Sequence, residues 1–67
     1  MNTNKVKGRM VELQITGRDL AREMNIDQST FYRKMKDNGE SFTLGEITTI
    51  KRVLKLDDQT AMDILLA

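Results

Sequence analysis

The sequence predicts a small all-α domain built from five short helices. Three observations support this fold class. The chain has only 67 residues, it contains three aromatic residues and no proline, and its apolar residues recur at helical spacing in short segments separated by turn signals. A chain of this length buries only about 60% of the surface that it exposes when unfolded. We therefore expect one domain over residues 1–67.

The composition excludes several kinds of site. The chain contains no cysteine and no histidine, so disulfide bonds and Cys/His zinc sites are excluded. Stability must come from packed apolar side chains, alone or together with a partner subunit. There is no signal-peptide core and no run of about 18 apolar residues. We therefore expect a soluble, cytoplasmic protein with no membrane segment.

The net charge of +1 conceals an uneven distribution along the chain. Residues 1–36 hold eight Lys or Arg residues and four Asp or Glu residues, a balance of +4. Residues 37–67 hold three and six, a balance of −3. Such an imbalance favours a polyanion-binding face at one end of the molecule. Ordinary solvated charge is the alternative, and this feature alone does not decide between the two.

The first helix is expected over residues 5–13, after four polar residues that should be frayed. Its apolar residues are spaced three or four apart, as one helix face requires: Val6, Met10 and Leu13. The opposite face is basic, and is either a solvated surface or a face that passes near a phosphate. Its cations are Lys5, Lys7 and Arg9.

The second helix is expected from Gly17 to about Met24. Thr16 can cap its start through the hydroxyl group, and Asp19 stands three residues later, as in a capping box. The residues expected to face the core are Leu20, Ala21 and Met24.

A three-residue break should separate this helix from a third helix over residues 28–36. Asn25 tolerates the left-handed conformation that ends a helix, Ile26 can point inward, and Asp27 can cap the next helix. In the third helix the residues expected to face the core are Phe31 and Met35.

The segment DNGE then predicts a turn before the fourth helix. Thr43 and Glu46 again have the spacing of a capping box. The apolar stripe of the fourth helix is expected to be Leu44, Ile47, Ile50 and Leu54.

Either Asp57 or Asp58 should cap the fifth helix. The last seven residues, AMDILLA, are apolar on more than one face, which favours burial on both sides. This helix either fills the core of its own domain or forms a self-complementary dimer surface. We expect a mixture of the two. The inward residues would be Ala61 and Leu65, and the dimer interface would hold Met62 and Leu66.

Large polar side chains gather on one side of the third helix, opposite its core residues. At about 100° per residue, this arc holds Ser29, Tyr32, Arg33 and Lys36, with Gln28 at its edge. Arg forms paired hydrogen bonds to guanine, Gln to adenine, and Ser to either base. An α-helix fits the major groove, and its N-terminal residues reach deepest when the preceding helix lies across the DNA backbone. The arc therefore favours DNA recognition.

The segment ITGRDLAREMNIDQSTFYRKMK, residues 15–36, resembles the helix-turn-helix of the Cro/lambda-repressor (XRE) class. The downstream segment FTLGEITTIKRVLKLDD is similar to the fourth-helix region of small phage and prophage regulators in that class. The resemblance covers residues 6–66. It implies a five-helix DNA-binding domain that binds pseudo-palindromic operators in double-stranded DNA, through the major groove, as a homodimer.

The resemblance also implies roles for particular residues. Gln28, Ser29 and Arg33 match the base-contacting positions of the class, with Thr30 and Tyr32 as secondary base contacts. Tyr32 has a second interpretation, in which its ring packs at the edge of the core. The residues that match phosphate contacts are Arg18 and Lys36.

Three positions depart from the pattern of the class. Gly17 stands where many members carry a glutamine that bonds a phosphate, so that contact should be missing. Asn25 replaces a common turn glycine, and asparagine tolerates the same geometry. Lys34 stands where many members have an apolar residue, and Met35 is expected to fill the core in its place.

We expect no catalytic residue, no metal site and no cofactor. A nucleophile needs an adjacent base and an orienting group, and the carboxylates are scattered at caps and turns. The expected function is that of a Cro-like bacteriophage repressor in a bacterial host cell, a dimer that occupies an operator and blocks RNA polymerase. It would take no small-molecule substrate.

Two other functions remain open. A protein-interaction module of the same fold would bind and modulate another regulator, which the modest net charge and the missing contact at Gly17 favour. A DNA-binding accessory factor, such as an excisionase-like or restriction-control protein, would share the surface and differ only in its target.

Overall fold

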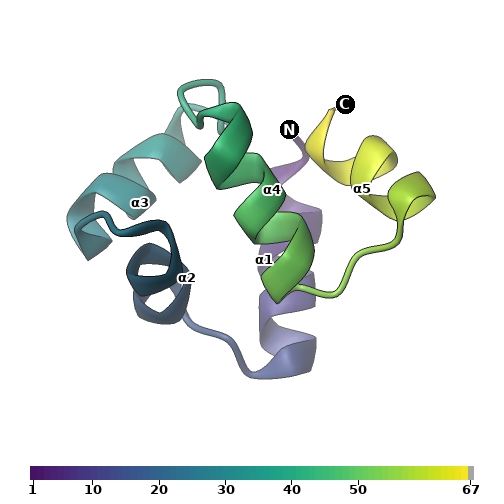
Figure 1. The fold of residues 1–67 in the computed structure, drawn as a ribbon, viewed down its shortest axis with the longest axis horizontal. Helices are drawn as coiled ribbons and strands as arrows, with labels where there is room; N and C mark the ends of the chain where they lie inside the picture. Colours follow the sequence, from purple (N-terminus) through teal and green to yellow (C-terminus); the bar gives the residue numbers. More distant parts are fainter. Residues whose placement is uncertain (67) are drawn as a thin grey trace.

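The computed structural model describes residues 1–66 and contains, within that range, five helices and no strand (Figure 1). In chain order the helices are α1 (Thr3–Leu13), α2 (Gly17–Met24), α3 (Gln28–Lys36), α4 (Leu44–Val53) and α5 (Asp58–Leu65). The predicted fold class, a small five-helix all-α domain, is therefore confirmed.

The helices are arranged around α4, which runs through the middle of the molecule in Figure 1, with α2 and α3 on one side and α5 on the other. α2 packs against both α3 and α4, while α1 packs against α5. The Asn2 N–H donates a hydrogen bond of 2.7 Å to the Ile64 carbonyl, so residues near the two ends of the chain also meet. This arrangement leaves α3 at the edge of the molecule.

The core is made by residues from all five helices. Its most deeply buried side chains have no exposed surface at all: Phe31, Leu20, Ile50, Leu54 and Val6. Leu44 was expected in this core, and that prediction is wrong, because its side chain is 79% exposed. At about 100° per residue, Leu44 points roughly 90° away from the mean direction of the other three residues of the predicted stripe.

Four of the helices end in the same way, with a polar residue in the left-handed conformation. These residues are Gln14 (φ 56°), Asn25 (φ 60°), Asn38 (φ 64°) and Lys55 (φ 55°). In each case the N–H of the following residue bonds the carbonyl five positions earlier, as in a Schellman motif. After Gln14, Asn25 and Lys55 the following residue is apolar and turns back toward the core. The prediction for Asn25 is confirmed.

The helix starts match the sequence in most cases. Thr16 with Asp19, and Thr43 with Glu46, form complete capping boxes, and Asp57 rather than Asp58 caps α5. The first residues are not frayed as expected. Asn2 Oδ1 accepts the Lys5 N–H at 3.2 Å and starts α1 at Thr3.

The prediction that Asp27 caps α3 through its side chain is wrong. Asp27 occupies the cap position, but its carboxylate makes no capping hydrogen bond. Its ψ angle of 149° departs from the 164–171° found at the three extended caps that do bond. Only the backbone carbonyl of Asp27 contributes, by accepting the Phe31 N–H at 3.0 Å.

Candidate nucleic-acid interface

The candidate interface is built on α2 and α3, two helices joined by three residues and packed directly against each other. Ala21 is only 3% exposed, and its small side chain lets the two helices approach closely. Leu20 and Phe31 are fully buried, and Ile26 in the turn packs against the same core. The two helices are therefore packed against each other and against the core on one side of α3.

The side of α3 that faces away from the core carries five exposed residues, which we call the α3 outer face: Gln28, Ser29, Tyr32, Arg33 and Lys36. Thr30, a predicted secondary base contact, is half-buried at its edge. Among residues 1–66, none of the outer-face side chains takes part in a hydrogen bond or an ion pair. Their polar groups are thus free to bind another molecule.

Most other charges near α2 and α3 are already paired. Within the described chain the ion pairs are Arg9–Glu12, Arg22–Asp19, Lys34–Glu46, Lys51–Asp58 and Arg52–Glu23. The cations outside these pairs include Arg18 at the start of α2 and two residues of the α3 outer face, Arg33 and Lys36. The unpaired positive charge predicted for DNA contact is therefore present on this two-helix unit.

The Tyr32 side chain does not point outward from α3 but lies across the start of α2. A Cβ atom added to Gly17 would lie 2.6 Å from Cζ and 2.9 Å from Cε1 of the tyrosine ring, and closer still to its hydroxyl oxygen. The ring also packs edge-on against Phe31, with centroids 5.4 Å apart and planes at 73°. Tyr32 had two interpretations, a base contact or a ring packed at the edge of the core. The structure has the packed ring, although the residue is still 45% exposed.

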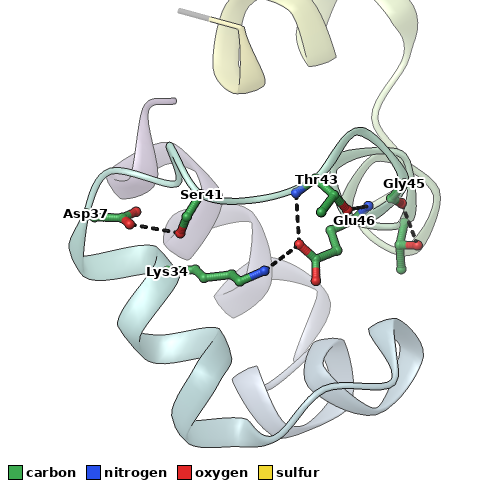
Figure 2. Close-up of polar contacts among 7 residues, drawn as sticks. Lys34, Asp37, Ser41, Thr43, Gly45 and Glu46 are labelled. Atoms are coloured by element: carbon green, nitrogen blue, oxygen red, sulfur yellow. Dashed lines mark hydrogen bonds and ion pairs between the residues drawn. The ribbon is translucent and has the colours of Figure 1, made fainter.

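An ion pair that the sequence pattern does not indicate attaches α3 to α4 (Figure 2). Lys34 Nζ lies 2.7 Å from Glu46 Oε1, and that same oxygen accepts the Thr43 N–H at 2.9 Å. The two charged side chains are only 16% and 12% exposed. Lys34 Nζ also lies 5.8 Å from the centre of the Phe42 ring, within the range of a cation–π contact.

This pair explains how a lysine is accommodated at a position expected to be apolar. Met35 is 5% exposed and fills the core, as predicted. Lys34 extends away from α3 toward Glu46, which its capping box already holds at the start of α4. The contact restrains the rotation of α3, and with it the direction of the outer face. The only signal in the sequence was a carboxylate at a cap, which does not identify its partner.

Within residues 1–66, three carboxyl groups have pKa values below their ordinary values, and each is a capping group. For Glu46, burial raises the pKa, but hydrogen bonds from Lys34 and from the Thr43 N–H outweigh it. For Asp19, the Thr16 N–H and then the Thr16 hydroxyl lower the pKa most. For Asp57, the Thr60 N–H is the main cause. All three favour the charged form at neutral pH.

The basic side of α1 is smaller than the sequence indicated. Arg9 Nε donates to the Leu54 carbonyl at 2.9 Å, and Arg9 Nη1 pairs with Glu12 at 3.2 Å. Arg9 therefore joins α1 to the end of α4 and belongs to the structure of the domain. Lys5 and Lys7 remain exposed.

A second surface lies between α4 and α5. Ala61 and Leu65 are buried while Met62 and Leu66 are 58% and 67% exposed, in the orientation expected from the sequence. Together with exposed Leu44, they border a mainly apolar groove of about 380 Å³, which we call the α4–α5 groove. None of its lining residues belongs to α2 or α3.

Comparison of the chain with protein-family models, curated proteins and solved structures finds no match. In residues 1–66, no helix has the length and apolar character needed to cross a membrane. The same residues contain no group of three or more His, Cys, Asp or Glu side chains able to hold a metal ion. The structure thus defines a small all-α domain whose α2–α3 unit presents an unpaired polar and cationic helix face.

Proposed function

We propose that this protein is a sequence-specific double-stranded DNA-binding regulator of the Cro/lambda-repressor type. One observation carries the proposal. The α3 outer face combines Gln28, Ser29 and Arg33 with no internal hydrogen-bond partner among the described residues, on a helix supported from behind by α2. Side chains of these types hydrogen-bond base edges in the major groove, which admits one α-helix.

In this proposal α3 lies in the major groove and α2 crosses the DNA backbone. Gln28, Ser29 and Arg33 hydrogen-bond base edges, with half-buried Thr30 as a further base contact. The unpaired cations Arg18 and Lys36 contact phosphates on either side of the groove. The bound protein represses transcription by excluding RNA polymerase from the operator. It acts in the cytoplasm of a bacterial host.

The proposed protein binds its operator as a homodimer through the α4–α5 groove. An exposed apolar patch in a small domain commonly marks an interaction surface. Because the groove holds no residue of α2 or α3, a second copy seated there leaves both outer faces free for two half-sites. Met62→Glu should abolish the dimer in analytical ultracentrifugation, while Val11→Glu, at a 77% exposed site on α1, should not. Equal dimerisation of the two variants would exclude this interface.

Fluorescence anisotropy with the DNA upstream of the protein's own gene tests the function. We expect nanomolar affinity that exceeds affinity for a scrambled duplex by about a thousandfold. Affinity should fall steeply between about 50 and about 200 mM salt, because bound phosphates release counterions. Weak binding that ignores sequence would refute the proposal.

A second candidate function is a protein-interaction module that binds and modulates another regulator. The α4–α5 groove favours it, because Leu44, Met62 and Leu66 expose apolar side chains that a heterologous partner could cover. Co-elution with a regulator encoded beside this gene, without any effect on DNA mobility, would support this candidate over operator binding.

A further inference from the structure

We propose that Tyr32 is a backbone-anchoring residue, whose hydroxyl binds a DNA phosphate beside Arg18 and does not read a base. This inference rests on the proposed DNA-binding function and assigns one residue of the α3 outer face to a different part of the DNA. It concerns the phosphodiester group, which is the same in every operator sequence.

The position of the Tyr32 ring supports this assignment. A side chain that reads a base must extend from α3 into the groove. Tyr32 instead lies back across Gly17, the first residue of α2, so its hydroxyl reaches the start of that helix. The ring also makes an edge-on contact with Phe31. The hydroxyl is thus positioned at the junction of α2 and α3.

The absence of a side chain at residue 17 permits this position. Any Cβ there would come within 3 Å of three atoms of the tyrosine side chain, so the ring would have to move. Gly17 and Tyr32 are therefore complementary: the glycine leaves the space and the hydroxyl end of the tyrosine occupies it.

The charges around the junction of α2 and α3 also support this assignment. When α3 enters the major groove, the preceding helix, α2, crosses the DNA backbone. Arg18 follows Gly17 directly, is exposed, and has no partner among residues 1–66. The nearby carboxylate of Asp19 is occupied on both oxygens, by the Thr16 N–H and by Arg22. The Tyr32 hydroxyl thus lies beside Gly17, whose neighbour in the chain is the unpaired cation Arg18. Tyrosine is among the side chains that bond phosphate oxygens.

The substitution Tyr32→Phe tests the inference because it keeps the ring and removes only the hydroxyl. The probe is a duplex selected by the wild-type protein from a random-sequence library, together with its single-base variants and copies that carry one uncharged methylphosphonate each. We expect affinity about 10- to 150-fold lower on every duplex, which corresponds to one hydrogen bond to a charged phosphate oxygen, with an unchanged base preference. The loss should vanish on the copy whose methylphosphonate replaces the contacted phosphate.

A second variant separates the role in binding from a role in folding. Gly17→Ala should displace the ring, and adding Tyr32→Phe to it should cause no further loss of affinity. Thermal unfolding would establish that each variant is folded. Unchanged affinity of Tyr32→Phe, or a changed preference at one base pair, would overturn the inference while leaving the DNA-binding function intact. A wild-type protein that selects no sequence from the library would overturn both.

Discussion

Replacing the two partners of the Lys34–Glu46 ion pair, singly and together, tests whether this contact holds α3 against the start of α4. Lys34→Met keeps a long unbranched side chain without the charge. Glu46→Gln keeps an oxygen that can accept the Thr43 N–H, because glutamine also serves at this position of a capping box. The departure of the double variant from the sum of the single variants gives the coupling free energy of the pair.

The burial of the pair sets the expected magnitude. Exposed ion pairs contribute about 0.2–1 kcal/mol, whereas removing one partner of a fully buried pair costs about 3–5 kcal/mol. The Lys34 and Glu46 side chains are 16% and 12% exposed, with 2.7 Å between their charged atoms. We therefore expect a coupling free energy of about 1–3 kcal/mol, between these two limits. The domain is small, so each 1 kcal/mol should change the melting temperature by about 4–8 °C.

The chain supplies a matched control. Arg52 and Glu23 also join two helices, α4 and α2, but their side chains are 64% and 43% exposed and their charged atoms lie 3.3 Å apart. The same four-variant cycle with Arg52→Met and Glu23→Gln should give no more than about 0.5 kcal/mol. Urea unfolding followed by far-UV circular dichroism, at one fixed protein concentration, measures both cycles. Equal coupling in the two pairs would refute the reasoning.

Three other predictions can be checked with the same protein preparations. Gly8→Ala should raise the free energy of unfolding by about 0.5–1 kcal/mol, since Gly8 lies inside α1 with nothing within 4 Å of an added Cβ. A lower free energy of unfolding in urea would contradict this. Stability should be constant near neutral pH and fall in acid, because the folded state lowers the pKa values of Glu46, Asp19 and Asp57. Their stabilisation is complete above the ordinary values, 4.5 for Glu and 3.8 for Asp, and is lost as the pH drops through the lower folded values. A melting temperature that does not change between about pH 7 and about pH 2.5 would rule this out. Arg33→Ala should cost about 1–3 kcal/mol of binding and relax preference at one base pair, whereas Lys36→Ala should weaken binding to all sequences alike; a library of single-base operator variants distinguishes the two, and an unchanged preference for Arg33→Ala would exclude its role in base reading.

Most of the fold could be predicted because its signals are local. Thr16 and Thr43 each meet a carboxylate three residues later, and that spacing alone defines a capping box. Asn25 ends α2 because few residue types adopt a left-handed conformation easily. Asp27 shows the limit of this kind of reasoning: the residue type predicts the cap position, but the carboxylate makes no capping hydrogen bond there.

The contacts that orient the candidate interface could not be predicted, because they join residues far apart in the chain. Lys34 and Glu46 are twelve positions apart, and their pairing depends on how α3 approaches α4. Tyr32 contacts Gly17 only because α2 and α3 cross where they do. The sequence identified the residues of the α3 outer face, but a helical wheel carries no information on neighbouring helices. Leu44 was misplaced for a different reason: the two successive spacings of three from Leu44 to Ile50 turn it about 120° away from Ile50 around the helix.

The hydrogen bond between Asn2 and Ile64 has a consequence for the connectivity of the chain. Since the residues near both ends already touch, a short linker should join them without disturbing α1 or α5. New ends could then be opened between Glu40 and Ser41, both exposed in the connection that precedes α4. In such a circular permutant α4 and α5 would precede α1 along the chain, while every helix pair that packs together would be kept. We therefore expect the three-dimensional packing of this domain to be separable from the order in which its helices are synthesised.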